Sequence, residues 1–205
     1  MNEVDQGAFR RAAGQFASGI VVVTTATGHA MTVSAFASVS LDPPLVLFCA
    51  EKIARFHDAV LEAGSWAVSI LAEDGEKTAR WLATRGRPLD GQLDGLAHHP
   101  GPATGAPALD DALAVLECQT DAVHDGGDHS IIVGWVVGVD APQDPAIPAS
   151  PAAPASPAAP ASPAAPASPA VPASPDGSRN PPPSGPLVHY SGAYRRLEPL
   201  DPPDP

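Results

Sequence analysis

Residues 31–46, MTVSAFASVSLDPPLV, are the part of the sequence that decides the fold. β-Branched, aromatic and small hydroxyl-bearing side chains run through residues 31–39 and predict a strand, and the sequence DPP at 42–44 ends it. Side chains this small let a planar ligand approach the backbone, and hydroxyls and backbone amides can hold a phosphate without many lysines. A serine-rich edge strand has the same composition, so a ligand site and a plain edge strand are both open at this point.

The segments around this stretch are short and follow no regular strand–helix alternation. Residues 20–25, IVVVTT, are β-branched throughout and predict a strand buried on both faces, in a hairpin with residues 31–39. Further strands are predicted over residues 45–49, 66–71, 112–123, 129–139 and 187–190, helices over 6–18, 55–63 and 73–84, and a long surface loop over 86–107. About six strands with two or three helices predict a mainly β fold, an antiparallel barrel with helical decoration.

A proline-rich segment at residues 141–186 interrupts this pattern. It holds 16 of the 26 prolines, and 12 of them follow one another at three-residue spacing over residues 142–175. Three residues per turn is the polyproline II period, and the segment has little to bury, so a polyproline or disordered insert is predicted. It is either a tolerated loop expansion or a docking ligand for the aromatic groove of a partner. The domain then comprises residues 1–140 plus 187–197, and residues 198–205 form a disordered tail.

The net charge of −12 restricts the classes of partner. An acidic surface without a basic stripe repels phosphate backbones, which argues against nucleic acid and anionic membranes. The N-terminus has no apolar core of signal-peptide length, and no run approaches the ~18 apolar residues of a membrane span, so a cytoplasmic protein is predicted. Cys49 and Cys118 lie in apolar runs and are expected to be buried thiols. The histidines and aspartates of residues 124–129 share one turn, and no metal site is predicted there.

Four blocks of sequence, in this order, resemble one known family. They are residues 16–25 (FASGIVVVTT), residues 31–46, residues 127–134 (GDHSIIVG), and residues 186–190 (PLVHY) with the nearby Tyr194. The chain is similar to the flavin reductase-like family of FMN-binding split barrels, the reductase components of two-component flavin-dependent monooxygenases. The resemblance covers nearly the whole domain. It implies a six-stranded antiparallel Greek-key split barrel that forms a homodimer, with the flavin near the dimer interface.

The resemblance also assigns flavin-binding residues. Three residues would line the isoalloxazine edge, Thr32, Val33 and Ser34, and three would contact the ring and the ribityl chain, Ser38, Val39 and Ser40. The loop on the phosphate side would contribute Ala50, Lys52 and Ile53; Glu51 in this loop is unfavourable, and Lys52 compensates. A charged and an aromatic residue near the flavin complete the set, Arg80 and Trp81.

The implied activity is hydride transfer from NADH or NADPH to FMN, FAD or riboflavin, with reduced flavin passed to a partner monooxygenase. The cofactors carry this chemistry, and the protein has to stack the two rings, exclude water and stabilise charge on the flavin. The resemblance places His129 on the nicotinamide side, where it would position the ring or support charge, although a histidine that merely caps the strand is equally compatible. The acidic surface favours NADH, since NADPH carries an additional phosphate. The alternatives are a non-catalytic flavin-binding barrel, and a barrel whose proline-rich arm recruits a partner.

Overall fold

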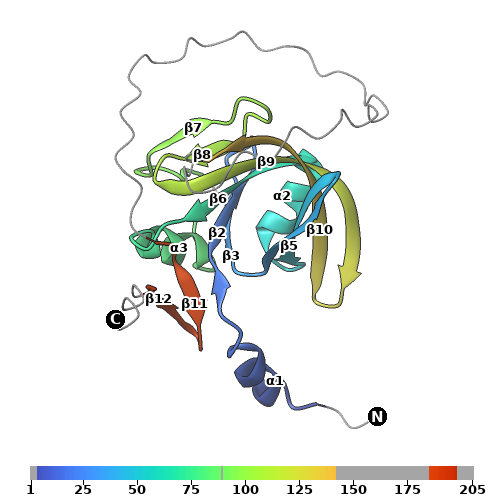
Figure 1. The fold of residues 1–205 in the computed structure, drawn as a ribbon, viewed down its shortest axis with the longest axis vertical. Coiled ribbons are helices and arrows are strands. Elements are labelled where there is room, and N and C mark those ends of the chain that lie inside the picture. The colour runs from blue at the N-terminus through green and yellow to red at the C-terminus, as the bar shows by residue number, and fades with distance from the viewer. Residues whose placement is uncertain (1–3, 89, 142–184, 198–205) are drawn as a thin grey trace, which may run out of the picture. The chain divides into compact units, whose positions relative to one another are not determined.

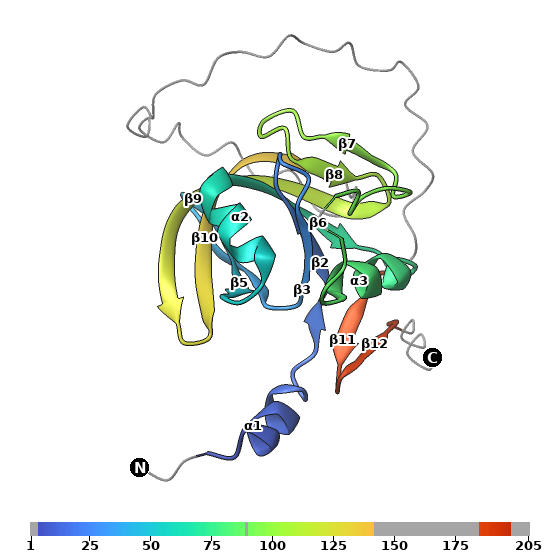
Figure 2. The ribbon, with the colours of Figure 1, turned by 180° about the vertical axis from the view of Figure 1, so that it is seen from behind.

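The computed structural model describes residues 4–88, 90–141 and 185–197. Its main sheet has seven strands in the order β3-β2-β6-β9-β10-β5-β4, and every neighbouring pair is antiparallel. These strands are β2 (Val21–Thr24), β3 (Ala30–Val33), β4 (Phe36–Leu41), β5 (Pro44–Glu51), β6 (Ser65–Leu71), β9 (Ala112–Gly126) and β10 (His129–Asp140). The sheet curls into a half-barrel (Figures 1 and 2), which confirms the mainly β, barrel-like fold predicted from the sequence.

The strand predicted over residues 31–39 is wrong in one respect, because the structure divides this stretch between the two edges of the sheet. β3 pairs with β2 at one edge, and β4 pairs with β5 at the other. Ser34 and Ala35 form the crossing between them, and the Ala35 carbonyl accepts a hydrogen bond from the Cys49 N–H at 3.0 Å. The main sheet consequently has seven strands where six were expected. A period of two shows that residues are extended, but it does not show which strand each of them pairs with.

Inside the curl lies a core of large apolar side chains. β2 is buried along its whole length, as the β-branched run predicts. Phe48 of β5 and Trp66 of β6 meet edge to face with their ring centroids 4.9 Å apart, and Ile132 of β10 packs in the same cluster. Gly134 of β10 lies against the Trp66 ring, where a side chain would collide with it. The absence of a side chain at this position therefore lets the indole fill the centre of the barrel.

Three helices accompany the sheet: α1 (Gln6–Ala13), α2 (Arg55–Ala63) and α3 (Glu76–Ala83). α2 has the predicted bounds and ends at Gly64, which adopts the left-handed conformation with φ 62°. It lies on the concave side of the sheet in both views and buries Phe56 and Val60 (Figures 1 and 2). The other two helices are shorter than predicted because glycine bounds each of them, Gly14 at the end of α1 and Gly75 at the start of α3.

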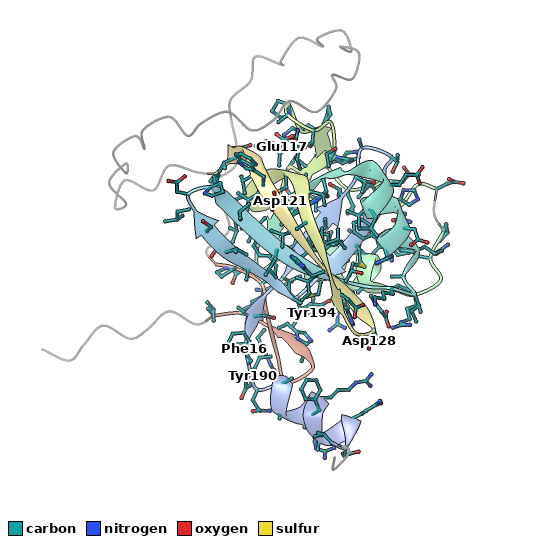
Figure 3. The ribbon with its side chains drawn as sticks, turned by 90° about the vertical axis from the view of Figure 1, so that its right-hand side faces the viewer. Phe16, Glu117, Asp121, Asp128, Tyr190 and Tyr194 are labelled. Carbon is teal, nitrogen blue, oxygen red and sulfur yellow. The ribbon has the colours of Figure 1, made fainter. Side chains whose placement is uncertain are left out.

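The segment predicted as a surface loop, residues 86–107, contains a short strand and the start of a second. These are β7 (His98–Pro100) and β8 (Pro107–Leu109), which pair with each other. Strands this short carry no alternating pattern, so prolines and glycines dominate the sequence signal. The side chain of Glu117 on β9 holds the connection between the two strands. Figure 3 shows Glu117 and Asp128 toward opposite ends of the β9–β10 hairpin.

A separate three-stranded sheet joins the two ends of the domain. It consists of β1 (Ser18–Gly19), β11 (Val188–Tyr190) and β12 (Ala193–Arg195) in the order β1-β11-β12, and neither the first nor the last of these strands was predicted. The predicted insert, apart from residues 141, 185 and 186, and the predicted tail lie outside the described residues. Over those described residues, no helix has the length and apolar character needed to cross a bilayer.

Candidate functional site

A pocket of about 410 Å³ opens beside β3 and the crossing at Ser34 and Ala35. Its lining comes from five parts of the chain: residues 29–35, the end of β5 with the start of α2, residues 82–87 at the end of α3 and beyond it, Gln92, and His129. This volume lies in the range of small-molecule and cofactor sites, ~300–1,000 Å³. The pocket therefore exists because the chain crosses from one sheet edge to the other at Ser34 and Ala35.

One wall of the pocket is built of small, uncharged residues, Thr32 to Ala35. The Thr32 hydroxyl donates to the Ala79 carbonyl at 2.8 Å, so this side chain holds α3 against β3. Cys49 of β5 also lines the pocket, and partial burial raises the pKa of its thiol above the usual value. A thiol with a raised pKa remains protonated and uncharged at neutral pH. This wall can accept a flat, largely apolar ring system close to the backbone.

A second wall carries three arginines, Arg55 at the start of α2 and Arg85 and Arg87 in the segment after α3. Arg55 donates to the Arg87 carbonyl, and Arg87 donates to the Thr84 carbonyl at 3.0 Å and to the Ala30 carbonyl. Partial burial, and secondarily the charge of Arg55, lower the pKa of Arg87 below its usual value. Among the described atoms, the buried Nε of Arg87 has no hydrogen-bond partner. This unmet donor and the crowded positive charge make the wall suited to an anion.

His129 and Glu51 face each other across β10 and β5 at the pocket. The His129 Nδ1 lies 2.7 Å from Asp128 Oδ1, and this hydrogen bond together with the imidazole charge lowers the pKa of the Asp128 carboxyl. Because a carboxylate only accepts, Nδ1 is the donor, and Nε2 is an acceptor when the ring is neutral and a second donor when it is protonated. Both Glu51 oxygens accept from Arg85 Nη2, at 2.7 and 2.8 Å.

The structure brings some of the predicted site residues to this pocket. Those that line it are Thr32, Val33, Ser34, Ile53 and His129. Ala50 is fully buried beside it, one residue before Glu51. Lys52, expected to compensate Glu51, forms an ion pair with Asp125 instead and lowers the pKa of that carboxyl. The positive charge beside Glu51 comes from Arg85.

The other predicted site residues do not line the pocket in the single chain. Ser38, Val39 and Ser40 lie further along β4, on exposed or half-buried positions of the sheet edge. On α3, Arg80 pairs with Glu76 and lies over the Tyr194 ring, 5.0 Å from its centroid. Trp81 donates from Nε1 to the Gln92 carbonyl at 2.9 Å. These two side chains of α3 are thus engaged with Glu76, Tyr194 and Gln92.

Sequence reasoning missed the arginine wall. Arg85 and Arg87 stand where a surface loop was expected, and Arg55 was noted only as the first residue of a helix. The signal available was the scarcity of cations: the chain has only 11 lysines and arginines, and two of them stand at residues 85 and 87. Gln92 was missed as well; it is a buried lining residue whose side-chain oxygen accepts from the Ala30 N–H at 3.0 Å.

Comparison with known proteins shows that the chain is similar to flavin reductases. The family model described as "Flavin reductase like domain" matches residues 13–198. The NADH-dependent FAD reductase of Streptomyces globisporus is 40% identical over 137 residues, which span 65% of this chain and 75% of that protein. The reductase subunit HsaB of a flavin-dependent monooxygenase from Mycobacterium tuberculosis is 34% identical over 137 residues, 65% of this chain and 71% of that protein.

A solved structure agrees with these relatives. The crystal structure of BorF, the flavin reductase component of a bacterial two-component tryptophan halogenase, superposes with a TM-score of 0.70. The two chains are 34% identical, and the match covers 93% of this chain and 97% of BorF. The resemblance inferred from four short blocks of sequence is therefore confirmed by both sequence and fold.

Proposed function

Because the chain belongs to the flavin reductase-like family, we propose that it is an NADH-dependent flavin reductase that supplies reduced FMN or FAD to a separate monooxygenase. The observation that carries this proposal is the pocket, in which a wall of small neutral residues adjoins a wall of arginines. A flavin nucleotide has the same two parts, a flat ring system and a phosphate. The relatives reported above are named for reduction of a flavin by NADH and for the reductase subunit of a monooxygenase.

Different residues of the pocket would bind the ring and the phosphate of the flavin. A bound flavin supplies the hydride-accepting chemistry, so the protein has to orient the reactants and exclude water. The backbone from Thr32 to Ala35 can lie against the ring, where small side chains leave it accessible. The unpartnered Nε of Arg87 fits a phosphate, because a buried donor without an acceptor is costly. Arg55 lies beside it on the same wall.

His129 stays the candidate for the nicotinamide side of the site. It lines the pocket next to Glu51 on the neighbouring strand, and its Nδ1 is hydrogen-bonded to Asp128. The Nε2 acceptor of the neutral ring can take a hydrogen bond from an amide, such as the carboxamide of nicotinamide. His129 then positions the nucleotide, and no proton transfer through the imidazole is required.

A homodimer is part of the proposal. Helix α1 has an apolar face but buries no residue within its own chain. Phe16 is 80% exposed, Leu41 of the edge strand β4 is 94% exposed, and Val139 of β10 is 65% exposed. Exposed apolar side chains of this size are typical of an interface. A second copy that covers β4 would also bring Ser38, Val39 and Ser40 into a shared environment, where their predicted flavin contacts can form. The predicted cytoplasmic location stays a prediction.

The test is the absorbance of NADH during turnover. Purified protein is mixed with NADH in air, and FMN or FAD is added in catalytic and then in excess amounts. We expect NADH consumption that depends on the flavin, and slower consumption with NADPH because of its additional phosphate. If flavin binds but neither nucleotide is oxidised, the chain is a non-catalytic flavin-binding protein and the proposal is wrong.

A further inference from the structure

The arginine wall of the pocket is only partly neutralised. Arg85 is neutralised, because both carboxylate oxygens of Glu51 accept from its Nη2. Among the described residues, no ion pair joins Arg55 or Arg87 to a carboxylate, and the hydrogen bonds given for Arg55 and Arg87 go to uncharged oxygens. Two guanidinium groups therefore keep their charge at the pocket, beside a third whose charge is cancelled by the protein itself.

The position of Glu51 follows from the local chain. It is the last residue of β5, and its carbonyl accepts from the Ala54 N–H at 2.9 Å in the turn that leads into α2. Arg55, the first residue of α2, comes directly after this turn. Arg85 holds the carboxylate, which lines the same pocket of about 410 Å³ as the unneutralised arginines. Any anion held by these arginines lies near a fixed negative charge.

We propose that Glu51 determines the affinity for the flavin nucleotide: it occupies Arg85 and repels the phosphate held by Arg55 and Arg87, so that the reduced nucleotide is released. This rests on the proposed function, since a reductase that supplies a monooxygenase has to let its flavin go. The repulsion acts only on a ligand that carries phosphate, because a neutral ligand has no charge for the carboxylate to oppose. Glu51 therefore discriminates FMN and FAD from riboflavin, which shares the ring and the ribityl chain but has no phosphate.

The test is equilibrium binding of FMN and riboflavin, followed by flavin fluorescence in the absence of NADH. We expect Glu51→Gln to raise the affinity for FMN about tenfold, the change that about 1.4 kcal/mol produces, and to leave riboflavin within about twofold. Release of FMN in stopped flow slows by a similar factor. The matched control is Glu62→Gln, which removes the same charge from the exposed side of α2, away from the pocket, and should change neither ligand.

A second variant protects the test against misfolding of the first. Arg85→Gln leaves the Glu51 carboxylate unpaired beside the phosphate, so the affinity for FMN should fall about tenfold while riboflavin binds as before. Higher salt should reduce the effect of Arg85→Gln on FMN affinity, because ions screen exposed charges. A thermal melt of each variant shows whether it is folded.

The outcomes separate this inference from the proposed function. If Glu51→Gln changes FMN and riboflavin equally, or weakens FMN, the carboxylate does not act on the phosphate and the inference is wrong. In that case flavin-dependent NADH oxidation by the wild-type protein still supports the reductase. If neither flavin binds to the wild-type protein, the proposed function itself is wrong.

Discussion

At the scale of single residues, the core of the barrel depends on what is missing at Gly134. A Cβ built there would lie 2.7 Å from Cη2 of Trp66 and 3.1 Å from Cβ of Cys118, and it would also collide with Cζ2 of the indole. Trp66 is fully buried and packs edge to face against Phe48, so a shift of the indole would disturb the core around it. The glycine and the tryptophan therefore form one packing unit, although 68 positions of sequence separate them.

We expect Gly134→Ala to lower the free energy of unfolding by about 1–3 kcal/mol, the cost of overpacking a close-packed core. Urea denaturation monitored by tryptophan fluorescence measures it. The control is Gly19→Ala, where a Cβ would meet no atom within 4 Å and the backbone is not left-handed. That variant should stay within about 0.5 kcal/mol of wild type. Equal stability of Gly134→Ala and wild type would contradict the packing described here.

Some residues of the pocket could be predicted from the sequence, and others could not. Thr32, Val33, Ser34 and Ile53 were assigned by resemblance and do line the pocket. The arginine at position 87 could not be found in this way, because its role depends on a buried Nε and on carbonyls of residues 30 and 84. Such contacts are set by the tertiary fold, and the sequence around Arg87 is dominated by glycine, proline and charged residues.

At the scale of elements, a buried carboxylate organises the connection between β7 and β8. Glu117 of β9 is 4% exposed, and its Oε2 accepts from the N–H of Ala103 at 2.9 Å and from the N–H and hydroxyl of Thr104 at 2.7 and 2.8 Å. The hydroxyl of Thr24 on β2 donates to the Pro107 carbonyl at 2.6 Å, which ties the same region to the sheet. A segment without a regular pattern is thus held by two side chains from distant strands.

Replacement of the Glu117 carboxylate should destabilise the connection between β7 and β8. We expect Glu117→Leu to lower the free energy of unfolding by about 3 kcal/mol, because two backbone N–H groups lose their acceptor in a buried site. Glu117→Gln should cost about 1 kcal/mol, since the amide oxygen can still accept. Denaturation in urea gives both values, and proteolysis should cut the β7–β8 connection first in the leucine variant. A leucine variant as stable as the glutamine variant would show that these hydrogen bonds do not hold the segment.

Element boundaries were predicted well where the determinants are local. α2 begins and ends at the predicted residues, and it ends there because Gly64 takes a left-handed conformation. α1 was predicted too long, since apolar spacing continues to Phe16 while the helix ends at Ala13. The residues that follow pair with β11 near the other end of the chain, which local spacing does not reveal.

At the scale of the whole molecule, the apolar edge of the sheet should govern assembly. If a second copy covers β4, a charge at Leu41 is buried on association and opposes it. We expect Leu41→Glu to convert a dimer into a monomer in light scattering coupled to gel filtration. The control is Ala26→Glu, which adds the same charge to an exposed turn between β2 and β3 and should remain dimeric. A wild-type protein that is monomeric at high concentration would remove the dimer from the proposal.

The sequence by itself determined the fold class, the family, the buried strand at residues 20–25, the α2 helix and the β9–β10 hairpin. These depend on periodicity, glycine and short motifs, which act over a few residues. Only the tertiary structure decided that residues 31–46 serve both edges of the sheet, that Arg55, Arg85 and Arg87 share one wall, and that Glu51 neutralises one of them. The reason is that strand pairing and side-chain charge pairing join residues far apart in the chain, and no local pattern records which partner each will meet.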